Sequence, residues 1–287
     1  MSRRDLARHE GFERISPEVG QLDETLLDRA LSETPDNTLA MLVDLTAATD
    51  QRLRELALRL AGRIMIGMAN RGSHRRRGVG RMTLRSYQPD GGDIDIDTSL
   101  DAVGEMRRFG ATDTDQIKIR GWMKPSTALC LVLDRSGSMG GQPLATSAMA
   151  TAAVANRFPR DYSVVMFAND VVIVKSQLVE KDPEVVMRDV LALRGFGTTN
   201  LSDALLAAEQ QLRDSRAGRK ITVLLSDCRA TVLGDVVAAA KNLDELVIIA
   251  PQSDDEEARQ FGAKVGARVT TVSGPSDIPD AFAQLFD

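Results

Sequence analysis

The sequence predicts an α/β protein with a doubly wound, mostly parallel sheet, preceded by a smaller, mainly helical domain that contains a β-hairpin. In the C-terminal part, short apolar runs alternate with segments of helical periodicity, which is the pattern of strands joined by crossover helices. Aromatic residues make up only 4% of the chain, so these runs are built from Val, Leu, Ile and Ala, as buried parallel strands generally are. We therefore expect an accessory domain over residues 1–120 and an α/β domain over residues 121–287.

The elements of the C-terminal domain follow from these patterns in chain order. Strands are expected at residues 128–133, 162–168, 171–176, 220–225, 246–250 and 268–272. Helices are expected at residues 143–158, 183–193, 201–213, 234–241, 253–261 and 278–286. Asn169 and Asp170 predict a tight antiparallel hairpin between the two strands that flank them. Asp182 is expected to cap one helix, and the segment from Ser253 to Glu256 is expected to form the capping box of another.

The N-terminal domain has a different character. Helical periodicity predicts three helices, at residues 22–31, 38–47 and 52–68, the last of them capped by Asp50. Two segments of alternating polarity, residues 82–87 and 93–97, flank a Pro-Asp-Gly-Gly turn sequence and predict a β-hairpin. The segment from Thr98 to Asp101 is then expected to cap a helix that ends at Arg108.

A cluster of basic residues interrupts this domain. Six arginines and no acidic residue lie between Arg71 and Arg85. The cluster has no interleaved aromatic residues and no RNA- or DNA-binding motif, so a nucleic-acid partner is not expected. We interpret it as a solvated loop, partly neutralised by the aspartates that follow, with contact to an acidic protein surface as the alternative.

The composition of the whole chain limits the possible functions. The net charge is −5, which gives no general affinity for polyanions. No apolar run approaches membrane-spanning length, so we expect no membrane association and a cytoplasmic location. Cys130 and Cys228 lie in or just after expected central strands and are predicted to be packing residues, with a redox-sensitive thiol as the alternative for Cys228. The two histidines, His9 and His74, both lie in the N-terminal third of the chain.

A candidate metal site lies in the C-terminal domain. Asp134, Ser136 and Ser138 directly follow an expected strand and place one carboxylate and two hydroxyls on a short turn. Thr199 precedes an expected helix, and Asp227 follows another expected strand. Loops beyond the carboxyl ends of parallel strands are where open α/β sheets bind ligands. Oxygen donors of this kind suit Mg²⁺, which has little use for His or Cys.

At these residues the chain resembles the von Willebrand factor A family, over about residues 121–287. The resemblance implies a Rossmann-like fold and a metal-ion-dependent adhesion site whose ligands would be Asp134, Ser136, Ser138, Thr199 and Asp227, with Thr198 competing for the role of Thr199. It also implies Mg²⁺, with Mn²⁺ or Ca²⁺ as alternatives, and a partner whose acidic residue completes the coordination. Cys228 stands where the family commonly has Gly.

The order of the domains is similar to that of the A-domain proteins that accompany MoxR-type AAA+ ATPases and to the C-terminal part of magnesium chelatase D subunits. This resemblance implies a non-enzymatic adaptor that binds such an ATPase or its client. A Mg²⁺-dependent hydrolase or phosphotransferase that uses Asp134 is the rival, but Ser136 stands where phosphatases of the haloacid-dehalogenase type need a second Asp. Nucleic-acid binding through the cluster from Arg71 to Arg85 is the third alternative.

Overall fold

The computed structural model describes residues 1, 3–6, 12–16, 18, 21–72, 81–86, 93–109, 117–123, 126–135, 141–193, 197–232 and 234–286. Its contacts divide the chain into two compact units. Unit 1 combines Met1–His74 with Thr127–Asp287, and unit 2 is Arg75–Ser126. This grouping differs from a single boundary at residue 120, because the N-terminal helices α4 and α5 pack against α7, which belongs to the C-terminal part of the chain.

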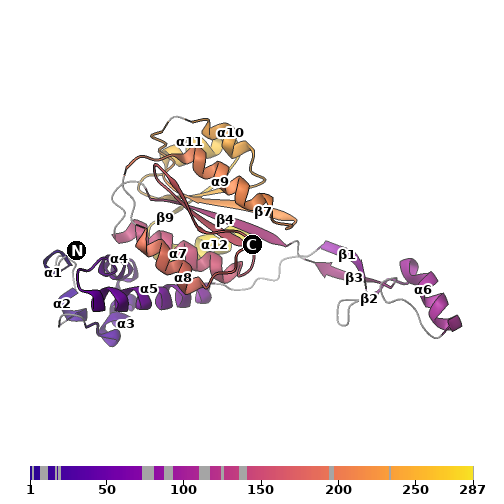
Figure 1. Ribbon diagram of the computed structural model, residues 1–287, viewed down its shortest axis with the longest axis horizontal. Coiled ribbons are helices and arrows are strands. Elements are labelled where there is room, and N and C mark those ends of the chain that lie inside the picture. The colour runs from indigo at the N-terminus through magenta and orange to yellow at the C-terminus, as the bar shows by residue number, and fades with distance from the viewer. Residues whose placement is uncertain are drawn as a thin grey trace. The chain divides into compact units, whose positions relative to one another are not determined.

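Unit 1 is built around a six-stranded sheet with the strand order β6-β5-β4-β7-β8-β9 (Figure 1). The strands are β4 (Thr127–Asp134), β5 (Tyr162–Phe167), β6 (Val171–Lys175), β7 (Arg219–Leu225), β8 (Leu246–Pro251) and β9 (Arg268–Val272). All neighbouring pairs are parallel except β5 and β6, which form the expected antiparallel hairpin. The predicted doubly wound sheet is confirmed, and its central strands are fully buried because apolar side chains occupy both of their faces.

Helices cover both faces of the sheet (Figure 1). One face carries α7 (Gly141–Arg157), α8 (Pro183–Ala192) and α12 (Ile278–Phe286), and the other carries α9 (Leu201–Arg213), α10 (Val236–Lys241) and α11 (Glu256–Val265). The Asp182 side chain caps α8 as expected, since its Oδ1 accepts the Glu184 N–H at 2.7 Å. The expected capping box at Ser253 is wrong: α11 begins at Glu256 after Asp255, whose side chain makes no capping bond.

The N-terminal helices form a further layer on α7. They are α1 (Arg3–Leu6), α2 (Phe12–Ile15), α3 (Glu24–Glu33), α4 (Pro35–Leu45) and α5 (Gln51–Gly72). The three predicted long helices are confirmed, and Asp50 caps α5 through a 2.7 Å bond from the Leu53 N–H to its Oδ1. Helix α7 fits between the sheet and α4 because its buried side chains are mostly alanines, which allow close approach on both sides.

Unit 2 contains β1 (Arg81–Ser86), β2 (Asp93–Ile94), α6 (Ile96–Phe109) and β3 (Lys118–Met123). The expected β-hairpin is wrong, because β3 lies between β1 and β2 and pairs antiparallel with both. Asp95, rather than Thr98, begins the helix: its Oδ1 accepts the Thr98 N–H at 2.9 Å. Four apolar side chains remain exposed on this unit: Leu84, Ile94, Ile96 and Leu100.

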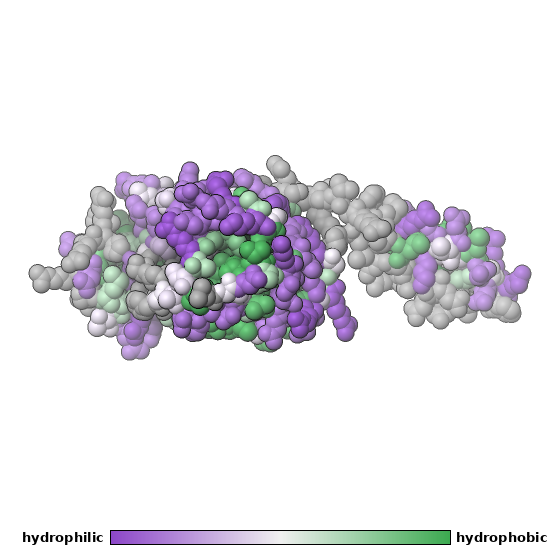
Figure 2. All heavy atoms as spheres, turned by 90° about the horizontal axis from the view of Figure 1, so that it is seen from above, coloured by the Kyte–Doolittle hydropathy of each residue, from purple (hydrophilic) through white to green (hydrophobic). Residues whose placement is uncertain are grey.

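None of the described helices has both the length and the apolar composition that a membrane crossing requires. On the face of unit 1 shown in Figure 2, polar side chains surround a central area of apolar ones.

A buried lysine lies at the end of β6. Lys175 is 3% exposed, and its Nζ donates to the carbonyl oxygens of Tyr162 at 2.6 Å and Ser176 at 3.1 Å. The same nitrogen lies 4.1 Å from the centroid of the Tyr162 ring. Burial lowers the pKa of Lys175 to about 8, and the negative charges of Asp161 and Glu180 only partly oppose this effect. The charged form is therefore less favourable in the folded protein than in water.

This lysine should make stability depend on pH. Between about pH 8 and about pH 10.4, the unfolded chain keeps a proton that the folded chain has lost, so the lysine's contribution to stability rises with pH. Relative to Lys175→Met, wild type should gain on the order of 2 kcal/mol in the free energy of unfolding between about pH 7.5 and about pH 10. Urea denaturation at both pH values measures this.

The comparison with Lys175→Met is needed because two buried thiols act in the opposite direction. Burial raises the pKa values of Cys130 and Cys228 to about 12, so their contributions fall as pH rises above the ordinary thiol pKa. Both thiols are present in both proteins and cancel in the difference. Parallel pH curves for wild type and Lys175→Met would contradict the prediction.

Candidate metal centre

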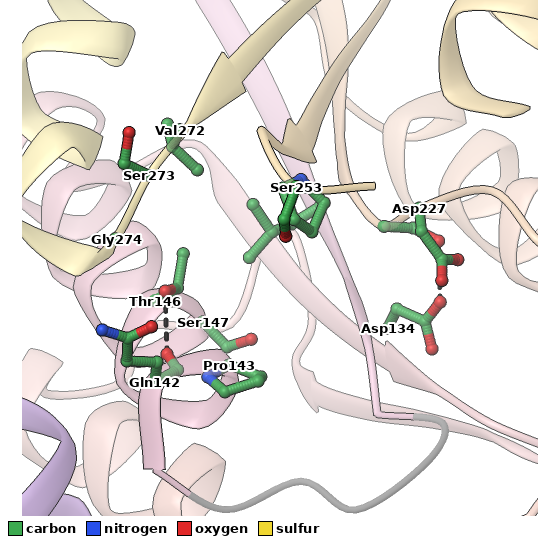
Figure 3. Close-up of a pocket in the computed structure, with 13 residues that line it drawn as sticks. Asp134, Gln142, Pro143, Thr146, Ser147, Asp227, Ser253, Val272, Ser273 and Gly274 are labelled. Carbon is green, nitrogen blue, oxygen red and sulfur yellow. Dashed lines mark hydrogen bonds between the residues drawn. The ribbon is translucent and has the colours of Figure 1, made fainter. Parts of the chain in front are cut away.

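Two carboxylates meet at the carboxyl edge of the sheet. Asp134 ends β4 and Asp227 follows β7, and these strands are parallel neighbours in register. Figure 3 shows the two side chains directed toward each other. Ser226 directly precedes Asp227, and its Oγ donates to Asp134 Oδ2 at 2.7 Å. The topology therefore brings together two acidic residues that are far apart in the sequence.

A cavity of about 370 Å³ opens beside this pair. Asp134 and Asp227 lie at one end (Figure 3). Ser226 also lines the cavity, and the remaining walls come from the end of β7, the start of α7 and the ends of β8 and β9. The residues of those walls carry no charge: Gln142, Pro143, Thr146, Ser147, Leu225, Pro251, Ser253, Val272, Ser273 and Gly274. The two aspartates are the only charged residues among the described side chains that line the cavity.

The charges around Asp227 favour a cation. Burial raises the pKa of Asp227, and the neighbouring charges of Asp134 and Asp254 raise it further, while the Arg229 N–H donates to its Oδ1 at 3.0 Å and opposes the shift. The Arg229 guanidinium pairs with Asp254 at 2.6 Å and with Glu257 at 3.3 Å. A bound cation would lower the energy of the two facing carboxylates.

Hydrogen bonds of its backbone fix the position of Thr199. Its N–H donates to Thr231 Oγ1 at 2.7 Å, and its carbonyl accepts the Thr231 N–H at 3.1 Å, so its loop is held against the segment after β7. The next residue, Asn200, donates its N–H to the Ala168 carbonyl at the end of β5 at 2.7 Å. Thr199 is 4% exposed, whereas Thr198 is exposed and its Oγ1 donates to Asn169 at 3.0 Å. Thr199 thus lies at the same edge of the sheet but is not one of the described residues that line the cavity.

Ser136 and Ser138 lie outside the described residues. Arg135 is described, and it is directed away from the carboxylate pair: its Nη2 contacts Asp170 Oδ1 at 2.5 Å in the β5–β6 turn. Over the described ranges, no three His, Cys, Asp or Glu side chains group as metal ligands. The described donors are therefore two carboxylates and neutral hydroxyls, and this oxygen set fits a hard divalent cation.

Cys228 has the backbone conformation of a glycine. Its φ is 64°, in the left-handed region that non-glycine residues seldom adopt. Its N–H donates to Ser226 Oγ at 2.9 Å, so the turn also fixes the serine that bonds Asp134. The side chain is 8% exposed, and its thiol, like that of Cys130, is free. Cys228 therefore adopts a glycine-like conformation at the position where the von Willebrand factor A family commonly has Gly.

Sequence reasoning missed Ser226 as a contact of Asp134. The sequence did contain a signal for this contact, because Ser226 directly precedes the candidate ligand Asp227 at the end of a strand. A hydroxyl at that position can reach the last residue of the neighbouring strand. The pairing of β4 with β7 was needed to recognise it.

Comparison with known proteins supports the assignment of the domain. A family profile described as "VWA domain containing CoxE-like protein" matches residues 65–268. The uncharacterized protein sll0103 of Synechocystis is 25% identical over 169 residues, which cover 55% of this chain and 40% of that protein. The chain thus spans less than half of the length of this relative.

Three solved structures are among those to which part of this chain is similar. The PilB minor pilin of Streptococcus sanguinis matches with 12% identity over 61% of this chain and 65% of its own, at a TM-score of 0.47. A von Willebrand factor type A structure from Catenulispora acidiphila matches with 15% identity over 58% and 43%, at a TM-score of 0.45. The manganese-loaded TRAP protein of Plasmodium vivax matches with 16% identity over 56% and 72%, at a TM-score of 0.43.

The family match covers more than half of the 287 residues, and it includes Asp134, Thr199 and Asp227. The sheet order and the helices on both faces agree with the fold that this match implies. The chain therefore belongs to the family of VWA domain containing CoxE-like proteins.

Proposed function

We propose that this protein is a non-enzymatic adaptor that binds a protein partner through a divalent cation. Membership of the family supports a protein-interaction module in general. The observation that carries the proposal is the facing pair of Asp134 and Asp227 beside an open cavity (Figure 3). The proposed ligands are Asp134, Ser136, Ser138, Thr199 and Asp227, and the proposed cation is Mg²⁺, with Mn²⁺ or Ca²⁺ as alternatives.

The charge of the donor set explains why such a site would bind a partner. Two carboxylates supply two formal negative charges, and hydroxyl ligands add none. A bound divalent ion would therefore remain electrophilic, because its ligands only just balance its charge. The aspartates would hold the ion and orient it toward the cavity, where an acidic side chain of a partner could complete the coordination.

We further propose that the partner is a MoxR-type AAA+ ATPase or the client of one, which places the protein in the cytoplasm. The order of a helical segment before the metal-binding domain supports this choice. The two alternative functions gain no specific support. The structure does not describe the arginine side chains between Arg71 and Arg85. It therefore provides no observation that supports nucleic-acid binding by this cluster.

Affinity capture from native lysate tests the proposed function. Tagged protein is incubated with lysate in millimolar Mg²⁺ or in EDTA, and the captured proteins are identified and assayed for ATP hydrolysis. An ATPase should be recovered in Mg²⁺ and lost in EDTA. Recovery of no ATPase in Mg²⁺, or turnover of phosphate esters by the purified protein alone, would contradict the adaptor function.

Cation binding should also stabilise the isolated protein. Saturating Mg²⁺ should add about 1–3 kcal/mol to the free energy of unfolding, because it offsets the repulsion between Asp134 and Asp227. For a unit of this size, that corresponds to a rise in Tm of roughly 2–10 °C. Asp134→Asn keeps the shape of the side chain and should remove the effect. Equal melting temperatures of wild type in EDTA and in millimolar Mg²⁺ would contradict the prediction.

A further inference from the structure

One side of helix α6 in unit 2 is uncovered. Ile96 is 64% exposed and Leu100 is 59% exposed, although both are large apolar residues. They are four residues apart, so they lie on the same side of the helix. A different side is covered, because Ser99 and Ala102 are buried and the Ser99 Oγ accepts the Lys118 N–H of β3 at 2.9 Å. The helix is thus held to the small sheet by one side and exposes an apolar stripe on another.

Gly104 continues this stripe. It follows Leu100 by four residues and lies within the helix, where glycine lowers helix stability relative to alanine. In the described part of the chain, a Cβ atom at this position would meet nothing within 4 Å. Packing inside the chain therefore does not require a glycine here. A glycine on an uncovered helix face allows another backbone to approach closely, so the position suits contact with a second molecule.

The charges of α6 divide between its two halves. Asp97 and Asp101 are exposed in the first half. Arg107 and Arg108 are exposed in the last turn. Among the described residues, none of these four side chains has an ion-pair partner. The helix dipole favours this order of charges, but it does not account for the apolar stripe between them. Two such helices in antiparallel orientation would place each acidic half against a basic end.

We propose that the exposed sides of α6 from two copies of this chain dock antiparallel and form a two-fold symmetric dimer. Leu100 of one copy would pack against Gly104 of the other, and Asp97 of one copy would lie near Arg108 of the other. The two-fold axis makes each of these contacts twice, so the face is complementary to itself. A parallel arrangement would instead bring like charges together.

The dimer should be weak, because one side of a 14-residue helix buries less surface than interfaces of standard size. We expect a dissociation constant in the micromolar range. Sedimentation equilibrium of the full-length protein in EDTA measures it between about 1 and about 300 μM. The average mass should rise with concentration toward that of a dimer. A monomer throughout this range, which would leave the face to another partner, would overturn the inference.

The inference does not depend on the proposed cation. Dimerisation should therefore be the same in EDTA and in millimolar Mg²⁺, whether or not the candidate metal centre binds an ion. A dimer that forms only in Mg²⁺ would indicate a bridge at the metal centre and would overturn docking through α6.

Reversal of single charges tests the antiparallel pairing. Asp97→Arg and Arg108→Asp should each weaken self-association at least about tenfold, because each homodimer then contains two repulsive contacts in place of two attractive ones. An equimolar mixture of the two variants should recover wild-type association to within about threefold, since the introduced arginine faces the introduced aspartate and the original pair is kept. Recovery also shows that both variants are folded. Unchanged association of either variant, or a mixture that does not recover, would overturn the pairing.

Two further variants separate docking from general effects. Glu105→Arg makes the same change of charge on a different exposed side of α6, and its association should stay within about threefold of wild type. Gly104→Gln should weaken association at least about tenfold, because the added side chain keeps the two helices apart. It should not lower the thermal stability of the monomer, since glutamine favours a helix more than glycine does. Equal weakening by Glu105→Arg and Asp97→Arg, or undiminished association of Gly104→Gln, would overturn the inference.

Discussion

Asp134→Ala is expected to weaken binding of the captured ATPase by about 2–5 kcal/mol, which is roughly 30- to 5,000-fold in Kd. The loss is large because the partner's acidic side chain would be left desolvated in the interface without the cation that it binds. The affinity is measured by surface plasmon resonance in millimolar Mg²⁺, and wild type in EDTA should show a similar loss.

Asp214→Ala provides the matched control for the change in charge. Asp214 is an exposed residue at the end of α9 that precedes β7, so it lies at the amino edge of the sheet, away from the cavity. Its substitution removes one negative charge and should leave the affinity unchanged. Similar losses for both variants would indicate a general electrostatic effect, and an unchanged affinity for Asp134→Ala would contradict a bridging cation.

Phe167→Ala is expected to lower the free energy of unfolding by about 3–5 kcal/mol, as is usual when a fully buried aromatic side chain is truncated. Phe167 ends β5 and is paired in register with Asp134 on β4. Its side chain is completely buried between the sheet and α9, in the cluster that includes Val132, Val165, Leu201 and Leu205. Truncation would therefore leave a cavity under the candidate metal centre.

Phe167→Leu keeps most of the apolar volume and should lose only about 1–1.5 kcal/mol. Urea denaturation at a constant Mg²⁺ concentration measures both variants, because cation binding itself changes the apparent stability. A loss below about 1 kcal/mol for Phe167→Ala would show that the core beneath the site is not tightly packed.

Much of unit 1 could be predicted because its signals are local. The strand at residues 268–272 and the helix at residues 278–286 have the predicted bounds, since a run of β-branched residues defines the strand and an amphipathic period defines the helix. Unit 2 was harder. The strand Lys118–Met123 contains two basic residues and a glycine and gives no apolar run, and its place between the two expected hairpin strands depends on long-range pairing.

The candidate metal centre was predictable to the extent that topology determines it. Asp134 and Asp227 meet because parallel neighbours end at the same edge, which follows from the strand order. Two hydrogen bonds of α4 near that edge follow from no local pattern: Asp44 Oδ1 accepts the Gly141 N–H, and Asp36 Oδ1 accepts the Ser276 N–H. They depend on how α4 packs against α7 and against the short helix Pro275–Asp277. A carboxylate within the apolar stretch from Leu39 to Leu45 was the available signal, since buried acids need a partner.

The discontinuity of unit 1 has a consequence for how the chain folds during synthesis. Helix α4 is buried from Thr38 to Leu45, but its main packing partner, α7, begins only at Gly141. The ribosome therefore adds about 100 further residues before α7 exists, which takes on the order of 5–20 s at ordinary rates of synthesis. Unit 2 lies within that interval and can form its own contacts first. During this time the apolar sides of α4 have only the neighbouring N-terminal helices to cover them, so the nascent chain is most prone to aggregation and most dependent on chaperones before the C-terminal half of unit 1 has been made.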